Sequence, residues 1–150
     1  MTNPKTVLFV CIGNSGRSLM AEAIFNANPP AGWVATSAGT NPAPTANPRT
    51  GPMLREIGLD LPPHPPQLLT PGMMDRARVR ITMGCLDDQS CPARLKTLEL
   101  RDWALPDPVP LDDAGFRQVR DRIVAAVKGL RTEIIVSDRR TASLPRSTSQ

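Results

Sequence analysis

The sequence predicts an α/β fold in which helices cover both faces of a parallel sheet. Short runs rich in β-forming residues alternate along the chain with stretches whose apolar residues recur at helical spacing. Of the 150 residues 40% are apolar, and no obvious linker interrupts the first 130, which fits one domain over residues 1–130. Residues 131–150 form an extension that we expect to be mostly disordered, because its last part, RRTASLPRSTSQ, has too little apolar content to pack. The stretch before it, TEIIVSD, could be an added strand or the end of a helix.

The first part of the chain supplies two strands and two helices. Residues 5–10, KTVLFV, predict a buried strand, and the helical pattern over 18–28 stops at a pair of prolines. Residues 33–37, WVATS, predict the second strand. After a proline-rich loop, an Asn-Pro pair is typical of a helix start, and this helix is expected over residues 47–58, closed by a glycine.

The second part repeats the alternation. Thr70, followed by proline, predicts the start of a short helix that leads into the alternating strand VRITM, residues 79–83. A further strand is expected within residues 95–100. After a proline-rich loop, Asp113 is expected to cap the final helix. The apolar stripe of that helix consists of Phe116, Val119, Ile123, Val127 and Leu130.

Composition excludes several function classes. The net charge of +4 is spread without a basic run, and only five residues are aromatic, so a nucleic-acid partner is not expected. No window approaches the roughly 18 apolar residues of a membrane span, so no membrane partner is expected either. We therefore expect a cytoplasmic protein.

The three cysteines also narrow the choice. Cys11, Cys85 and Cys91 are too few for a secreted disulfide framework, which favours reduced thiols in a cytoplasm. The single histidine, His64, and the absence of a C-x-x-C motif disfavour a zinc site, and no redox-active metal is expected. His64 itself is expected to be structural or exposed.

Cys11 stands where a parallel sheet binds its ligands, at the carboxyl end of the first strand. The short loop after it passes directly into a helix, so its backbone N–H groups can turn inward and form an anion site. Two glycines permit unusual backbone conformations, Asn14 tolerates a left-handed one, and Ser18 can donate its hydroxyl near the helix start. The expected oxyanion-binding residues are Ile12, Gly13, Asn14, Ser15, Gly16 and Arg17.

The positive electrostatic potential of these N–H groups, the helix start and Arg17 favours the thiolate form of Cys11, which would then be a nucleophile. The alternative is an inert cysteine buried at a strand end. The loop lacks the lysine of a nucleotide-binding P-loop and the third glycine of a dinucleotide fingerprint, so a nucleotide is not the expected ligand.

These residues resemble a known family. The stretch VLFVCIGNSGRSLMAEAI is similar to the opening of the low-molecular-weight protein tyrosine phosphatase superfamily, whose signature is Cys, five residues, Arg and Ser after the first strand. The resemblance continues through TSAGT, MLREIGLDL, TMGC and DWALPDP and so covers residues 5–130. It implies a four-stranded parallel sheet with helices on both faces, Cys11 as the nucleophile and Asp107 as the general acid. Without it, Asp107 could equally be a turn aspartate between two prolines.

The superfamily contains phosphatases and thioredoxin-coupled arsenate reductases, and the segment MGCLDDQSCP resembles the redox segment of the latter. This resemblance implies that arsenate is the substrate, that phosphate and sulfate compete with it, and that a disulfide passes from Cys11 to Cys85 and then to Cys91. Thioredoxin or another thiol reductant would close the cycle. The alternative for Cys85 and Cys91 is two unrelated structural thiols. The expected catalytic residues are Cys11, Arg17, Ser18, Cys85, Cys91 and Asp107.

Two other functions stay open: hydrolysis of phosphate monoesters by a phosphatase, and oxyanion binding or thiol sensing without catalysis. The chain has no tyrosine, and no aromatic residue follows Asp107 until Phe116, which favours a small inorganic oxyanion over a phosphotyrosine ring. Trp103 could still form a wall of the site. Many relatives have a cysteine where this chain has Gly16.

One cofactor is also open. Some arsenate reductases of the superfamily bind potassium beside the loop, and Asn14, Glu22 and Ser37 match its ligands. An aspartate expected in that set falls near Gln67, which weakens the case for the cation. No other cofactor is expected to be required.

Overall fold

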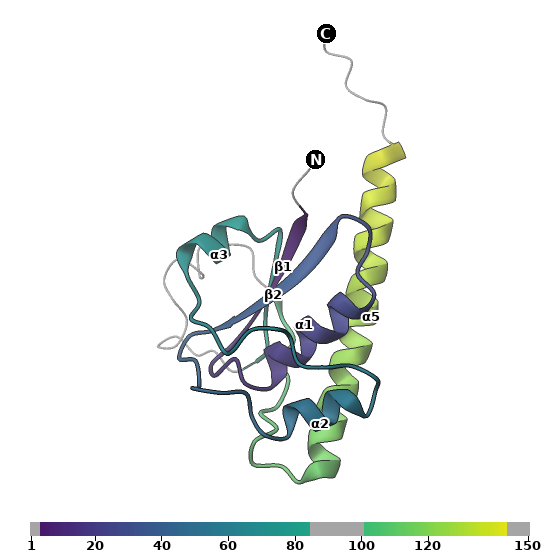
Figure 1. The fold of residues 1–150 in the computed structure, drawn as a ribbon. Helices are drawn as coiled ribbons and strands as arrows, with labels where there is room; N and C mark the ends of the chain where they lie inside the picture. The colour runs from purple at the N-terminus through teal and green to yellow at the C-terminus, as the bar shows by residue number, and fades with distance from the viewer. Residues whose placement is uncertain (1–3, 85–100, 144–150) are drawn as a thin grey trace.

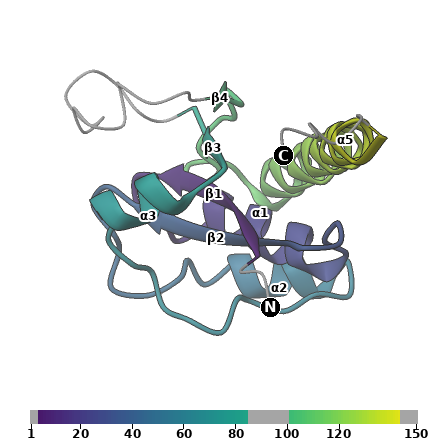
Figure 2. The same ribbon diagram turned by 90° about the horizontal axis from the view of Figure 1, so that it is seen from above.

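The computed structural model describes residues 4–84 and 101–143 of the chain. Its strands are β1 (Lys5–Cys11), β2 (Trp33–Gly39), β3 (Val79–Thr82) and β4 (Arg101–Asp102). They form one parallel sheet in the order β2-β1-β3-β4, which confirms the expected four-stranded architecture (Figures 1 and 2). The strand expected within 95–100 lies outside the described residues, and β4 follows directly after it.

Alternation along β1 separates two layers of core. Val7 and Phe9 face one cluster, which contains α1 (Arg17–Ala27), α2 (Thr50–Arg55) and α5 (Asp113–Ser143). Leu8 and Val10 face a smaller cluster, which contains α3 (Pro71–Arg76). Figures 1 and 2 both show α3 across β1 from α1 and α5, so the sheet carries helices on both faces as predicted.

Helix starts agree with the sequence in part. Thr70 caps α3 as predicted, because its Oγ1 accepts the N–H of Met73 at 3.2 Å. The cap of α5 is Asp112 and not Asp113: the Asp112 carboxylate accepts the N–H of Gly115 at 2.8 Å. Helix α2 is shorter than the 47–58 predicted for it, and it stops before Gly58, whose positive φ of 78° reverses the chain.

The expected disorder from residue 131 is wrong as far as Ser143, because α5 continues to that residue. Ile134 extends the buried stripe of α5 by one further turn. Asp138 then accepts the Trp33 indole N–H at 2.9 Å and pairs with Lys5 at 3.5 Å, which ties the added turns to the amino-terminal edge of the sheet. Within residues 4–84 and 101–143, no helix is long and apolar enough to cross a membrane.

Candidate active site

The loop between β1 and α1 is held from outside by the segment that follows β2. The carbonyls of Cys11, Ile12, Gly13 and Ser15 accept backbone N–H groups of this segment at 2.8–3.2 Å; the donors are Thr40, Asn41, Ala43 and Asn47. In a trans peptide unit the C=O and N–H point in opposite directions. The N–H groups that follow those four carbonyls therefore point inward, and the N–H of Asn14 lies 3.2 Å from the Cys11 sulfur.

The backbone conformation of this loop agrees in part with the sequence prediction. Asn14 has a positive φ of 49°, as predicted. Gly16, with φ −139° and ψ −89°, lies outside the main α and β regions, whereas neither Gly13 nor Gly16 has a positive φ. The glycine that the loop requires is Gly39, at the end of β2. A Cβ on Gly39 would collide with the carbonyl of Ile12 and would lie 3.0 Å from the nitrogen of Asn14. Sequence reasoning missed this residue, although it lies in the TSAGT stretch.

The sulfur of Cys11 is buried and lies within hydrogen-bond distance of two groups. The side chain of Asn14 donates to the Ser18 hydroxyl oxygen at 2.7 Å, and this hydroxyl lies 2.9 Å from the sulfur, to which it can donate its proton when the sulfur is a thiolate. The backbone N–H of Asn14 is the second donor. Two donors aimed at one sulfur suit a negative charge on that atom.

Arg17 lies at the start of α1 and crosses to the opposite wall of the site. It is 7% exposed, and its Nη1 donates to the carbonyls of Met83 at 3.2 Å and Leu105 at 3.0 Å. Met83 follows β3, and Leu105 opens the loop that carries Asp107. One guanidinium nitrogen therefore fixes the side chain to two other segments.

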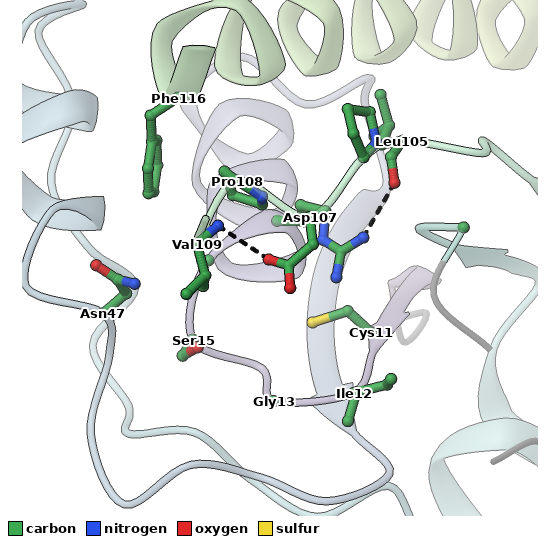
Figure 3. A pocket seen from close by; sticks show the side chains of 14 residues that line it. Cys11, Ile12, Gly13, Ser15, Asn47, Leu105, Asp107, Pro108, Val109 and Phe116 are labelled. Carbon is green, nitrogen blue, oxygen red and sulfur yellow. Dashed lines mark hydrogen bonds between the residues drawn. The ribbon is translucent and has the colours of Figure 1, made fainter. Parts of the chain in front are cut away.

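One cavity of about 370 Å³ collects the predicted loop and the predicted acid. Figure 3 shows the Cys11 sulfur and the Asp107 carboxylate pointing into the same space. The Asp107 carboxylate accepts the N–H of Val109 at 3.0 Å and is otherwise exposed. The residues that line the cavity are Cys11, Ile12, Gly13, Ser15, Gly16, Arg17, Asn47, Gly84, Leu105, Pro106, Asp107, Pro108, Val109 and Phe116.

The aromatic wall differs from the expectation. Trp103 is not among the residues that line the cavity; it packs against Phe9, with ring centroids 5.5 Å apart. Phe116, from the first turn of α5, lines the cavity in its place. The sequence placed Phe116 only on the core stripe, and no local pattern indicates that the stripe begins at the site.

Gly84 brings the end of β3 to the cavity. Its φ is +83°, and a Cβ would lie 2.6 Å from the Cα of Ala104, so this close approach requires glycine. Sequence reasoning did not single it out. Cys85 comes next in the chain, but Cys85 and Cys91 both lie outside the described residues.

The three residues considered for potassium do lie together, but their oxygens already accept hydrogen bonds. Ser37 donates to the Glu22 carboxylate at 2.7 Å and accepts from Asn14 at 3.0 Å. The N–H of Gln67 donates to the Asn14 Oδ1 at 3.0 Å, and its side-chain amide donates to the Ser37 carbonyl at 2.8 Å. Because nitrogen donors stand where a cation would need free oxygens, the arrangement does not fit potassium. Among the described residues, no group of three or more His, Cys, Asp or Glu side chains could hold a metal ion.

His64 completes this buried cluster. Its Nε2 lies 2.8 Å and 3.0 Å from the two oxygens of the Glu22 carboxylate. Burial alone would lower the pKa of His64, but hydrogen bonds to the Pro65 carbonyl and to Glu22 outweigh it and raise that pKa above its ordinary 6.5. A histidine cation is therefore available to neutralise the buried carboxylate.

Most of the chain matches one protein family. The family described as low molecular weight phosphotyrosine protein phosphatase matches residues 6–140. The chain belongs to this family.

Within this phosphatase family, the chain resembles arsenate reductases. Arsenate reductase 1 of Staphylococcus epidermidis is 32% identical over 124 residues, covering 83% of this chain and 93% of the relative. A solved structure described as an arsenate reductase in the phosphate binding state is 30% identical, with a TM-score of 0.76 over 87% of this chain and 98% of that one. The thioredoxin-dependent arsenate reductase of Corynebacterium glutamicum is 28% identical, with a TM-score of 0.75 over 91% of this chain and 64% of that one. The resemblance predicted from the motif is confirmed, and this member of the phosphatase family is an enzyme.

Proposed function

We propose that the protein reduces arsenate to arsenite through an adduct on Cys11 and a disulfide relay among its three cysteines. The observation that carries the proposal is the single cavity that Cys11, Arg17 and Asp107 share with Gly84, the residue before Cys85. The curated and solved relatives named as arsenate reductases support the substrate. The relative named as thioredoxin-dependent supports thioredoxin as the reductant.

The first step is a displacement at arsenic. The Cys11 thiolate attacks As(V), an S–As bond forms, and one oxygen leaves as water after Asp107 protonates it. The inward N–H groups of the loop and the Arg17 guanidinium hold the remaining oxygens and their charge. Phosphate and sulfate have the same tetrahedral shape and compete for these donors.

The second step moves two electrons. The Cys85 thiolate attacks the Cys11 sulfur, an S–S bond forms, and the S–As bond breaks with its electron pair left on arsenic, which leaves as arsenite. Two thiols are thereby oxidised to one disulfide as As(V) is reduced to As(III). Cys91 then attacks Cys85, which frees Cys11 and leaves a Cys85–Cys91 disulfide for the dithiol of thioredoxin to reduce.

The test is arsenate turnover with thioredoxin, thioredoxin reductase and NADPH. The Cys11→Ser variant is expected to release no arsenite. The Cys91→Ser variant is expected to release at most about one arsenite per chain and then stop, because it cannot pass the disulfide on to thioredoxin. The alkylation rate of Cys11 and its reduction by phosphate should be the same in this variant as in the parent. This comparison is the control for correct folding. Full thioredoxin-coupled turnover by Cys91→Ser would refute the relay.

Hydrolysis of phosphate monoesters is the second candidate, favoured by the Phe116 ring in the cavity wall. It needs only Cys11, Arg17 and Asp107, with water attacking phosphorus in a Cys11 phosphoenzyme. A parent that hydrolyses aryl phosphates, keeps that rate in the Cys85→Ser and Cys91→Ser variants and releases no arsenite with any thiol would establish this function instead. Oxyanion binding without either turnover would indicate a noncatalytic module.

A further inference from the structure

The segment after β2 contacts both walls of the cavity. On the loop side, the N–H of Asn47 and the hydroxyl of Thr50 both donate to the carbonyl of Ser15, at 2.9 Å and 2.7 Å. Arg49 lies between these two residues and reaches the other way, to the loop that carries Asp107. One short stretch of chain therefore bridges two loops. They are the loop of residues 12–17, called the oxyanion loop below, and the loop of residues 105–112 that carries Asp107, called the acid loop.

The guanidinium of Arg49 makes an extended set of contacts with the acid loop. Its Nη1 donates to the carbonyl of Leu111 at 2.8 Å, and its Nη2 donates to the carbonyls of Val109 at 2.9 Å and Pro108 at 3.2 Å. The Nη1 also lies 3.4 Å from the Asp113 carboxylate. The Cζ lies 4.7 Å from the ring centroid of Phe116, which forms a cation–π contact beside the cavity.

Asp107 depends on its own loop for its position. Among the described residues, its carboxylate accepts one hydrogen bond, the local one from the N–H of Val109, so its placement follows the backbone of the loop. Prolines on both sides stiffen that backbone and let it move as a unit. Arg17 fixes the loop at Leu105, ahead of Asp107, and Arg49 fixes it behind.

We propose that Arg49 is a positioning residue for Asp107, which it holds against the oxyanion loop without touching the substrate. The proposal rests on the role of Asp107 as the general acid in the proposed function. The planar fork of arginine presents two nitrogens to three carbonyls at once, which the single ammonium of a lysine cannot do. Loss of this support lets the acid move away from the leaving oxygen, and small displacements of a catalytic group cost large factors in rate.

A double-mutant cycle between Arg49 and Asp107 tests the proposal. Arg49→Met is expected to lower kcat for arsenate at least tenfold with thioredoxin and NADPH in excess, and Arg49→Lys should recover only part of the loss. In the Asp107→Asn background, Arg49→Met is expected to change kcat less than twofold, because the acid it positions is absent. Arg122→Met, which removes an exposed arginine of α5, is the matched control and should leave kcat unchanged. An equal fold loss in both backgrounds would overturn the proposal.

Two readouts separate this proposal from the proposed function. The phosphate concentration that halves the alkylation rate of Cys11 should not change in Arg49→Met, because the oxyanion loop is intact. Hydrogen exchange at Val109 and Leu111 should rise at least tenfold in Arg49→Met and not in Arg122→Met. If the parent reduces no arsenate, the cycle is repeated with an aryl phosphate, and exchange at these amides decides the positioning role even without turnover. Unchanged exchange in Arg49→Met refutes it.

Discussion

Asn14 supports the oxyanion loop through three side-chain hydrogen bonds, and its substitution gives a quantitative prediction. Its side chain is fully buried and donates to the hydroxyl oxygens of Ser18 and Ser37, while its Oδ1 accepts the N–H of Gln67. Its positive φ of 49° is a conformation that asparagine adopts more readily than alanine. Asn14→Ala therefore removes three hydrogen bonds and adds backbone strain.

The magnitude follows from these contacts. Three hydrogen bonds at roughly 1 kcal/mol each give about 3 kcal/mol, and the left-handed backbone adds roughly 1 kcal/mol for alanine. We expect the free energy of unfolding to fall by about 4 kcal/mol, a large part of the roughly 5–15 kcal/mol typical of a domain. For a chain of this size that corresponds to a fall in Tm of about 8–16 °C.

The matched control is Asn26→Ala. Asn26 also makes paired side-chain bonds, donating to the Ala35 carbonyl at 3.0 Å and accepting the Ala35 N–H at 2.8 Å, but it contacts no part of the oxyanion loop. The Asn26→Ala substitution should lower the free energy of unfolding by about 2 kcal/mol. The phosphate concentration that halves Cys11 alkylation should rise at least tenfold in Asn14→Ala and stay unchanged in Asn26→Ala.

Urea unfolding and the alkylation assay together decide the case. A loss of under 1 kcal/mol in Asn14→Ala would refute the account of the loop as held by this side chain. An equal shift in phosphate protection in both variants would show that general destabilisation, and not the loop, sets oxyanion affinity.

Three further predictions follow from the structure. Gly39→Ala should abolish phosphate protection of Cys11 at millimolar phosphate, because the added Cβ collides with the Ile12 carbonyl; protection like that of the parent would contradict this. His64→Gln should be less stable than the parent by an amount that is greatest below about pH 6.5 and shrinks as pH rises, because the pKa of His64 is raised in the folded state. A difference between these two proteins that is constant from pH 5 to pH 9 would exclude the charged pair with Glu22. Ile134→Ala should lower the free energy of unfolding by about 2–5 kcal/mol, the usual cost for a buried isoleucine; a loss below 1 kcal/mol would mean that the end of α5 adds little.

The predicted final helix illustrates what periodicity alone can reveal. All five residues of its predicted stripe are buried, and Ile134 continues the same spacing. The sequence left residues 132–138, TEIIVSD, open between an added strand and a helix end, because three consecutive apolar residues suit a strand as well as a helix. What holds the added turns is the contact of Asp138 with Lys5 and Trp33, more than a hundred positions away in the chain. A contact between residues this far apart in the sequence cannot be predicted from the periodicity of neighbouring residues.

The candidate site divides in the same way. Cys11, Arg17 and Ser18 lie within eight consecutive residues, so their positions around one loop could be predicted from the sequence. A residue that the loop requires comes from elsewhere, Gly39 from β2, and so does Phe116, which α5 contributes to the cavity wall. The charged partner of Glu22 was also missed, because His64 meets it only after folding. The roles of Cys85 and Cys91 stay a prediction, since both lie outside the described residues.

Both candidate reactions begin with the same event, attack by Cys11 on a tetrahedral oxyanion, so the oxyanion loop cannot decide between them. They differ in the second nucleophile and in the atom it attacks. Water attacking phosphorus leaves the oxidation state unchanged, whereas a thiol attacking the Cys11 sulfur requires a central atom that can accept two electrons, as As(V) can. Under the proposed function, the choice between the two reactions therefore rests on Cys85 and Cys91, which follow Gly84, a residue of the cavity lining, in the sequence. This is why substitution of Cys85 or Cys91 should separate reduction from hydrolysis, whereas substitution of Arg49 should affect both.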